Sequence, residues 1–127
     1  MKKLFYLFSM MVMLCGVAYA QSGDKATISA KVTEHDFGNI KESDGKVSCV
    51  FTVTNTGKAP LVITRVIASC GCTTPQYEQE PIAPGKSGKI TVTYNPAGRP
   101  GQFVKTIAVY SNGKDGAFTL KIKGNVQ

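Results

Sequence analysis

Two cysteines separated by one glycine, Cys70 and Cys72, are the residues of this sequence best suited to chemistry. In a regular strand, the α-carbons of residues i and i+2 lie about 7 Å apart, at or beyond the usual disulfide range of about 4.4 to 6.8 Å. Gly71 can bend the backbone and bring the two sulfurs together. A disulfide closed over so short a loop should be strained and easily reduced, which is typical of thiol–disulfide exchange.

The same pair suits two other roles. Two thiolates on one side of a turn can bind Cu(I), with Cys49 or His35 as a third ligand if the fold brings either one near. The structural alternative is that Cys70 and Cys72 only hold a tight turn, as a local disulfide or as two buried thiols. All three roles stay open. We expect that the protein binds no cofactor, and the alternative is a copper ion bound by Cys70 and Cys72.

The remaining residues do not form a catalytic set. Cys49 alternates with Val47, Phe51 and Val53, and is therefore predicted to be a small core residue. His35, the one histidine, is predicted to be structural and partly exposed. The sequence has no Gly-x-Ser-x-Gly element and no phosphate-binding glycine loop leading into a helix. We therefore expect a protein that is not an enzyme unless the cysteine pair is redox-active.

The first twenty residues have the features of a secretory signal peptide. Two lysines are followed by an apolar run that is shorter than a membrane span, and then by Ala18-Tyr19-Ala20 and the polar Gln21. We therefore predict cleavage after Ala20 and export to the periplasm or cell envelope, or secretion. The alternative is a lipoprotein lipidated at Cys15, but Leu14 stands where such a signal requires a small residue.

The chain after the signal is long enough for one domain only. We expect a short polar linker over residues 21–25 and a single domain over residues 26–127, without a transmembrane segment. Loss of Lys2 and Lys3 lowers the formal charge from +7 to +5. The remaining lysines are scattered, which favours a solvated surface over a nucleic-acid groove.

Apolar side chains recur at every second position in much of the domain, which predicts strands. This alternation occurs over residues 28–32, 47–53, 90–94, 103–109 and 118–122, with a bent continuation of the first strand over residues 35–40. Gly38 is the expected kink in that continuation. Residues 61–68 are almost continuously apolar and are predicted to form a central strand covered on both sides. No segment after the signal has a helical period.

Turn residues separate these strands. We expect a turn at Asn55-Thr56-Gly57, loops at residues 81–85 and 95–101, and a hairpin at Asn112-Gly113. About seven strands in roughly 100 residues predict an immunoglobulin-like β-sandwich, with a closed barrel as the alternative. The chain has no tryptophan and no inward cysteine that could pair with Cys49, so hydrophobic packing must hold the two sheets together.

The sequence contains several short motifs that recur together in one family. They are Phe37-Gly38-Asn39-Ile40, the segment from Phe51 to Gly57, Leu61-Val62-Ile63, Ser69-Cys70-Gly71-Cys72-Thr73, Pro84-Gly85 and Tyr94-Asn95-Pro96. With these motifs the chain resembles an exported family known as domain of unknown function 1573. The resemblance covers about residues 34–126. The Phe-x-Val-x-Asn-x-Gly element is shared with immunoglobulin-like modules of the major sperm protein and pilus-chaperone type, whereas the Cys-Gly-Cys-Thr element is specific.

The resemblance implies a sandwich fold and a location in the bacterial envelope, often in Bacteroidetes, but no settled activity. We therefore expect a non-catalytic binding or structural module whose partner is an envelope protein or a glycan. The alternative is that the Cys-Gly-Cys segment carries out thiol–disulfide exchange or binds Cu(I).

Overall fold

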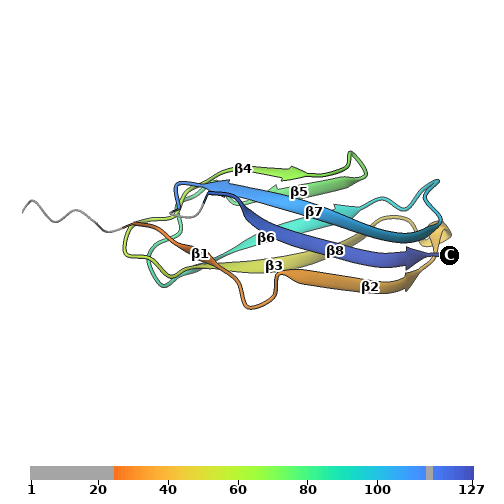
Figure 1. Cartoon of the computed structure of the whole chain (residues 1–127), viewed down its shortest axis with the longest axis horizontal. Helices are drawn as coiled ribbons and strands as arrows, with labels where there is room; N and C mark the ends of the chain where they lie inside the picture. Colours follow the sequence, from red (N-terminus) through yellow and green to blue (C-terminus); the bar gives the residue numbers. More distant parts are fainter. Residues whose placement is uncertain (1–24, 114–115) are drawn as a thin grey trace, which may run out of the picture.

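Eight strands form two four-stranded sheets that stack face to face (Figure 1). The computed structural model describes residues 25–113 and 116–127. The strands are β1 (Ile28–Ser29), β2 (Glu34–Ile40), β3 (Val47–Asn55), β4 (Ile63–Ala68), β5 (Thr73–Tyr77), β6 (Ser87–Tyr94), β7 (Gly101–Ser111) and β8 (Phe118–Val126). The predicted all-β sandwich is thus confirmed, with one strand more than the seven or so expected.

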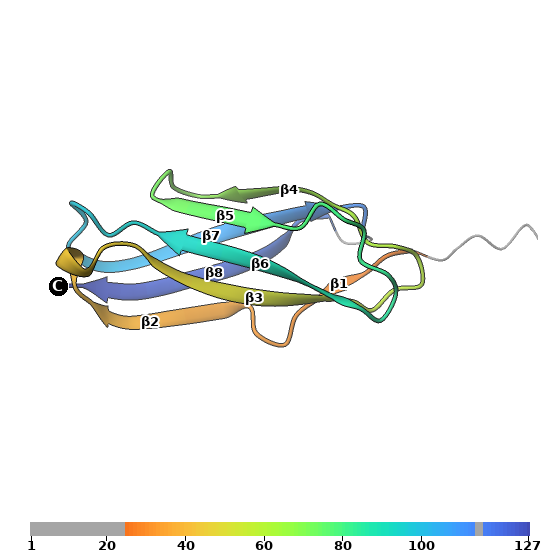
Figure 2. The ribbon, with the colours of Figure 1, turned by 180° about the vertical axis from the view of Figure 1, so that it is seen from behind.

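Two of the connections between the sheets join edge strands, at the sides of the sandwich. One sheet has the order β1-β3-β6-β5 and the other has the order β2-β8-β7-β4. The segments between β1 and β2 and between β4 and β5 therefore pass from one sheet to the other, on opposite sides. Figure 2, the view from behind, shows the sheet of β1, β3, β6 and β5 in front. Pairing is antiparallel throughout, except that β2 runs parallel to β8.

Helical structure is minimal in the described residues. A single 3-10 turn, η1 (Glu42–Asp44), links β2 to β3. No helix among residues 25–113 and 116–127 is long and apolar enough to cross a membrane. The predicted signal peptide, the alternative lipidation at Cys15 and nearly all of the predicted linker lie outside the described residues, so the predicted domain boundaries stay predictions.

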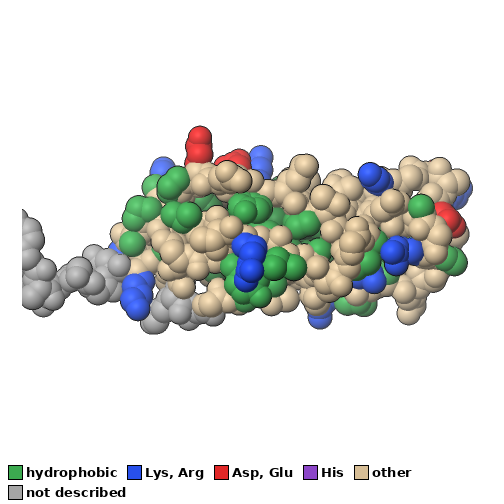
Figure 3. Space-filling view, turned by 90° about the horizontal axis from the view of Figure 1, so that it is seen from above, with side chains coloured by type: hydrophobic (Ala, Val, Ile, Leu, Met, Phe, Trp, Pro, Cys, Tyr) green, Lys and Arg blue, Asp and Glu red, His purple; other side chains and the backbone are tan. Residues whose placement is uncertain are grey.

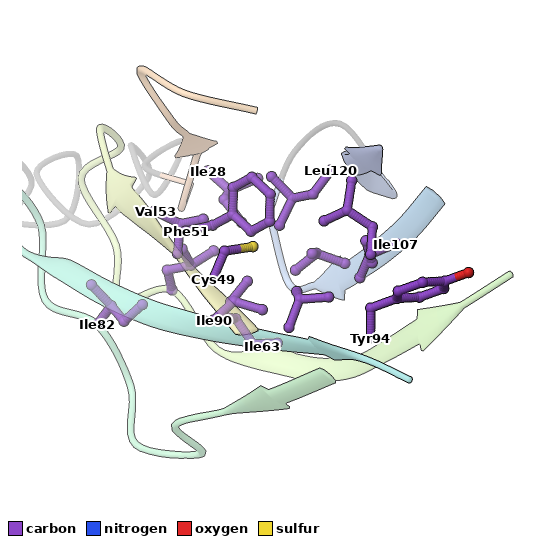
Figure 4. Packing of buried hydrophobic residues seen from close by; sticks show 14 of the residues in the cluster. Ile28, Cys49, Phe51, Val53, Ile63, Ile82, Ile90, Tyr94, Ile107 and Leu120 are labelled. Atoms are coloured by element: carbon purple, nitrogen blue, oxygen red, sulfur yellow. The ribbon is translucent and has the colours of Figure 1, made fainter. Parts of the chain in front are cut away.

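The core consists of inward-facing side chains from both sheets, as the alternation predicts. Figure 4 shows side chains from several strands meeting between the sheets. The fully buried members include Phe51, Val53, Ile90, Val92, Ile107, Val109, Leu120 and Ile122. At one end of the core the rings of Tyr94 and Phe103 stack with their centroids 4.0 Å apart. Burial of apolar surface at about 25 cal/mol per Å² is the main force holding the sheets together.

The prediction of a central strand over residues 61–68 was wrong. Strand β4 lies at the edge of its sheet and pairs only with β7. Its outer face meets solvent, and Ile67 is 45% exposed. Arg65 lies over the ring of Tyr110, 4.4 Å from its centroid, so a cation–π contact holds its charge at the surface. A run of apolar residues predicts a strand, but it does not fix the strand's position in the sheet.

Two further strand predictions needed correction. Strand β5 occupies the start of the segment between Cys72 and Pro81, for which we predicted no strand, and the first strand covers residues 28 and 29 only. Val32 is 60% exposed because the chain there is crossing from one sheet to the other. The kink predicted at Gly38 is confirmed: its φ is 67°, and the β2–β8 register shifts between Asp36 and Asn39.

Candidate functional site

The two cysteines of the Cys-Gly-Cys segment are joined in a disulfide at the turn between β4 and β5. This turn carries the chain from one sheet to the other. The α-carbons of Cys70 and Cys72 lie 5.2 Å apart, within the usual range for a disulfide. Gly71 is exposed, and a β-carbon at this position would meet no atom within 4 Å. The glycine therefore lies on the open side of the turn.

Hydrogen bonds from main-chain N–H groups fix the turn. Cys72 N–H donates to Cys70 Sγ at 3.1 Å, and Thr73 N–H donates to the Cys70 carbonyl oxygen at 3.1 Å. Asn95 N–H donates to the Cys72 carbonyl oxygen at 2.9 Å. The second cysteine is therefore anchored to the end of β6, whereas the first lies at the end of an edge strand.

The two sulfur-bearing residues differ in exposure. Cys70 is half-buried, whereas Cys72 is only 7% exposed. The hydroxyl of the buried Thr73 lies 3.6 Å from Cys72 Sγ. Cys70 is therefore more accessible than Cys72 to a reagent in solution.

A hollow of about 280 Å³ adjoins the disulfide. It is lined by Lys46, Gly71, Cys72, Thr74, Gln76, Thr93 and Asn95. Lys46 is the one charged residue of this lining, and its threonine, glutamine and asparagine residues offer hydroxyl and amide groups. The hollow is suited to a polar segment of chain, and its single cation favours a neutral or acidic segment over a basic one.

The structure does not bring the predicted third copper ligands to the pair. Cys49 is buried on β3 with its side chain directed into the core, where desolvation raises the pKa of its thiol to about 11 (Figure 4). His35 lies on β2, at the edge opposite β4, and its ring packs edge-on against Phe37 at 4.6 Å. Among the described residues, no three His, Cys, Asp or Glu side chains group as metal ligands would.

Lys46 and Lys105 are residues of this region that the sequence alone did not single out. Ala68 of β4 pairs with Ile107 of β7, and Ser69 N–H donates to the Thr106 carbonyl oxygen at 2.9 Å. Lys105 precedes Thr106 on β7, on the stretch of that strand beyond the end of the β4 ladder. Lys105 is half-buried. Because the pairing of β4 with β7 is long-range, no local sequence signal could have identified this juxtaposition.

A family model described as "Protein of unknown function (DUF1573)" matches residues 28–126. No curated protein matches the sequence. Among solved structures, a protein of unknown function from Porphyromonas gingivalis W83 is 17% identical, with a TM-score of 0.72. The match covers 85% of this chain and 50% of that protein, so this chain spans half the length of that relative.

Two other similar structures come from proteins of different kinds. The ASH or PapD-like domain 7 of human CEP192 is 8% identical with a TM-score of 0.66, and the match covers 81% of this chain and 87% of that domain. The VesB protease of Vibrio cholerae is 19% identical with a TM-score of 0.63, and the match covers 80% of this chain but 32% of the protease. At these identities the similarity shows the fold alone, and it confirms the immunoglobulin-like class.

Proposed function

We propose, on the premise that this chain belongs to the DUF1573 family of proteins of unknown function, that its domain is a non-catalytic module of the cell envelope that binds an extended protein segment along β4. Such binding would add a strand to the sheet, with main-chain hydrogen bonds supplying affinity and side chains supplying specificity. The observation that carries the proposal is that β4 has an unprotected edge, whereas the other three edge strands are protected against pairing with another strand.

Three of the four edges are protected against pairing with another strand. Strand β1 has only two residues. Strand β2 carries the exposed acidic residues Glu34 and Asp36 and is interrupted at Gly38. Strand β5 contains Pro75. Cys72 accepts a hydrogen bond from Asn95 and therefore faces β6, and alternate residues of the strand face β6 and solvent. The nitrogen of Pro75 therefore lies at the outer edge of the sheet. Short length, charges, bulges and prolines are the usual protections of an edge.

Strand β4 has none of these protections along its second half. Ser69 donates its main-chain N–H to Thr106 of β7, so Ser69 faces β7. Because the direction alternates along a strand, Val66 and Ala68 direct their N–H and C=O groups away from β7. Within the described part of the chain, no group donates to or accepts from these four outward main-chain groups. The Thr64 carbonyl oxygen, on the same side, accepts a hydrogen bond from the Tyr77 hydroxyl at 3.2 Å. Two consecutive outward positions are thus available to a partner strand.

Side chains beside this edge are of the kind found in protein interfaces. Arg65, Ile67 and Tyr110, which we call the β4 patch, share the outer face of the sheet. Arginine and tyrosine are enriched at positions that dominate binding energy. Figure 3 looks onto the side of the sandwich formed by β4 and β5 and shows hydrophobic side chains gathered there. The β4 patch next to free main-chain groups favours a protein segment over a glycan, because those groups can pair with a strand.

Two observations support the remaining parts of the proposal. His35 packs against Phe37, while the neighbouring Asp36 carboxylate accepts from Gly38 N–H at 2.8 Å, so the one histidine is not arranged as a catalytic base. The signal-peptide pattern of residues 1–20 supports a location outside the cytoplasm.

The test is a photo-crosslinking capture from native envelope extract with a crosslinker placed at Ser69. Wild type is compared with Val66→Pro, which removes one outward N–H without breaking a bond to β7, and with Ile67→Asp in the β4 patch. Val50→Asp is the matched control, because Val50 is 55% exposed on the other sheet. We expect wild type and Val50→Asp to capture the same protein, and both β4 variants to lose it.

Hydrogen exchange then tests the mode of binding. Addition of the captured protein should slow exchange of the Val66 and Ala68 amides. Capture that is equal in all four proteins would contradict the proposal. Capture of glycan alone, surviving protease treatment of the extract, would contradict it as well.

A further inference from the structure

We propose that the Cys70–Cys72 disulfide exchanges with the cysteines of a protein dithiol, and that Cys70 is the sulfur that forms the mixed disulfide. This inference goes beyond the proposed function and does not depend on it. It assigns different roles to two cysteines that the sequence presents as equivalent.

Exposure is the first reason to assign attack to Cys70. Cys70 is half-buried at the end of an edge strand, whereas Cys72 is 7% exposed and is held by the Asn95 N–H bond to its carbonyl oxygen. Exchange requires the attacking sulfur to reach a disulfide sulfur, so access decides which sulfur reacts. Cys72 is then positioned to resolve the mixed disulfide from the protein side.

Stabilisation of the thiolate is the second reason. Cys72 N–H donates to Cys70 Sγ at 3.1 Å, and the same donor would remain next to a Cys70 thiolate after reduction. This main-chain donor favours the Cys70 thiolate, which is the leaving group of the second step of exchange and the attacking form of the reduced protein.

The exchange balances without any further reagent. A thiolate of the partner dithiol attacks Cys70 Sγ, a new S–S bond forms, the Cys70–Cys72 bond breaks, and its electron pair leaves on Cys72 Sγ, which takes a proton from water. The second partner thiol loses its proton and attacks the partner sulfur of the mixed disulfide, releasing the Cys70 thiolate. The partner dithiol is oxidised to a disulfide, and this protein's disulfide is reduced to a dithiol by the same two electrons.

The hollow beside the disulfide is lined by Gly71 and Cys72 but not by Cys70, so it lies next to the resolving sulfur and not next to the attacked one. The substrate class is an exposed cysteine-containing segment of another protein that can reach Cys70 at the end of β4.

The test compares Cys72→Ser, which leaves Cys70, with Cys70→Ser, which leaves Cys72. The probe is oxidised glutathione, and mass spectrometry follows formation of the mixed disulfide at pH 7. Both variants retain the buried Cys49, so any reaction at Cys49 contributes equally to the two rates. We expect Cys72→Ser to react about tenfold faster or more, in line with the effect of thiolate content and access on exchange. Equal rates, or a faster Cys70→Ser, would overturn the assignment. Circular dichroism of each variant shows whether it is folded.

Wild-type protein provides a measurement that needs no substitution. The oxidised protein is treated briefly with reduced glutathione and quenched with acid, and peptide mapping locates the adduct. We expect the adduct on Cys70. An adduct on Cys72, or none before the protein unfolds, would overturn the proposal. The β4 variant Val66→Pro should react as wild type does, so failure of the strand-addition proposal and failure of this one are distinguishable.

Discussion

The side chain of Asn55 donates from Nδ2 to the carbonyl oxygen of Ile82 at 2.9 Å, linking the end of β3 to the loop before β6. The same amide nitrogen donates to the Ala59 carbonyl oxygen at 2.8 Å, and its Oδ1 accepts from Gly57 N–H at 3.0 Å. Asn55 is fully buried, so every polar atom of its side chain is satisfied by main chain. One side chain therefore organises two loops.

Replacement of Asn55 by alanine should destabilise the protein by about 3 kcal/mol or more, because it leaves several buried main-chain groups without partners. Urea unfolding measures the change. The control is Asn112→Ala, since the exposed Asn112 also bonds two main-chain groups, those of Val62 and Pro60. There water replaces the lost bonds, and we expect a loss of about 1 kcal/mol. Similar losses at the two positions would contradict the role assigned to Asn55.

Gly124→Ala should destabilise the domain by about 1 to 3 kcal/mol through overpacking. A β-carbon at this position would lie 2.9 Å from two ring carbons of Phe103 and 3.1 Å from the Gly38 carbonyl oxygen. Thermal unfolding measures the effect, and Phe103→Leu in the same chain should recover part of it. Gly71→Ala, where the new methyl group meets open space, is the control and should leave the melting temperature unchanged.

Stability should fall with rising pH through the thiol of Cys49. Burial raises the pKa of this thiol to about 11, above its value in an unfolded chain. Between those two values the unfolded state has released the proton that the folded state still holds, so increasing pH favours unfolding. Urea unfolding of wild type and Cys49→Ala at pH 7, 8.5 and 10 measures the slope. We expect wild type to lose more stability over this range, and identical slopes would contradict the prediction.

The Cys70–Cys72 disulfide should contribute only about 1 to 2 kcal/mol to folding. It closes a loop with a single intervening residue, so it removes little entropy from the unfolded chain. Burial of apolar side chains from both sheets supplies most of the stability and should keep the reduced protein folded. Urea unfolding with and without reductant gives the difference. Cooperative loss of the fold on reduction would show that the bond is essential to the structure.

Local periodicity predicted the strands well wherever one face is buried. The alternation around Phe51, Ile90 and Leu120 is the direct result of inward and outward positions on a sandwich sheet. It also identified Cys49 as a core residue. These features depend on neighbours in sequence and on the hydrophobic effect, both of which a single sequence contains.

The errors concern pairing partners. Strand β4 contains an apolar run like that of a covered strand, but only its position at the sheet edge explains the exposed Ile67 and the contact of Arg65 with Tyr110. Strand β5 was missed because it is short and contains Pro75, which is unfavourable in a central strand but tolerated at an edge. Nothing local reveals which strand lies next to which.

For the candidate site, the sequence identified the cysteine pair but not its surroundings. The Cys-Gly-Cys spacing indicated that Gly71 could bring the two sulfurs together, and the pair is a disulfide in the structure. The difference in exposure between Cys70 and Cys72 and the hollow with Lys46 both arise from segments distant in sequence.

The parallel pairing of β2 with β8 determines how the domain would respond to mechanical force. Both strands run toward the same end of the long axis, and β1 lies toward the other end (Figure 1). A pull on β1 away from the end of β8 would slide β2 along β8, loading the hydrogen bonds of that ladder simultaneously instead of opening them one by one. A domain stretched in this direction would therefore resist rupture, because all the hydrogen bonds between β2 and β8 carry the force together.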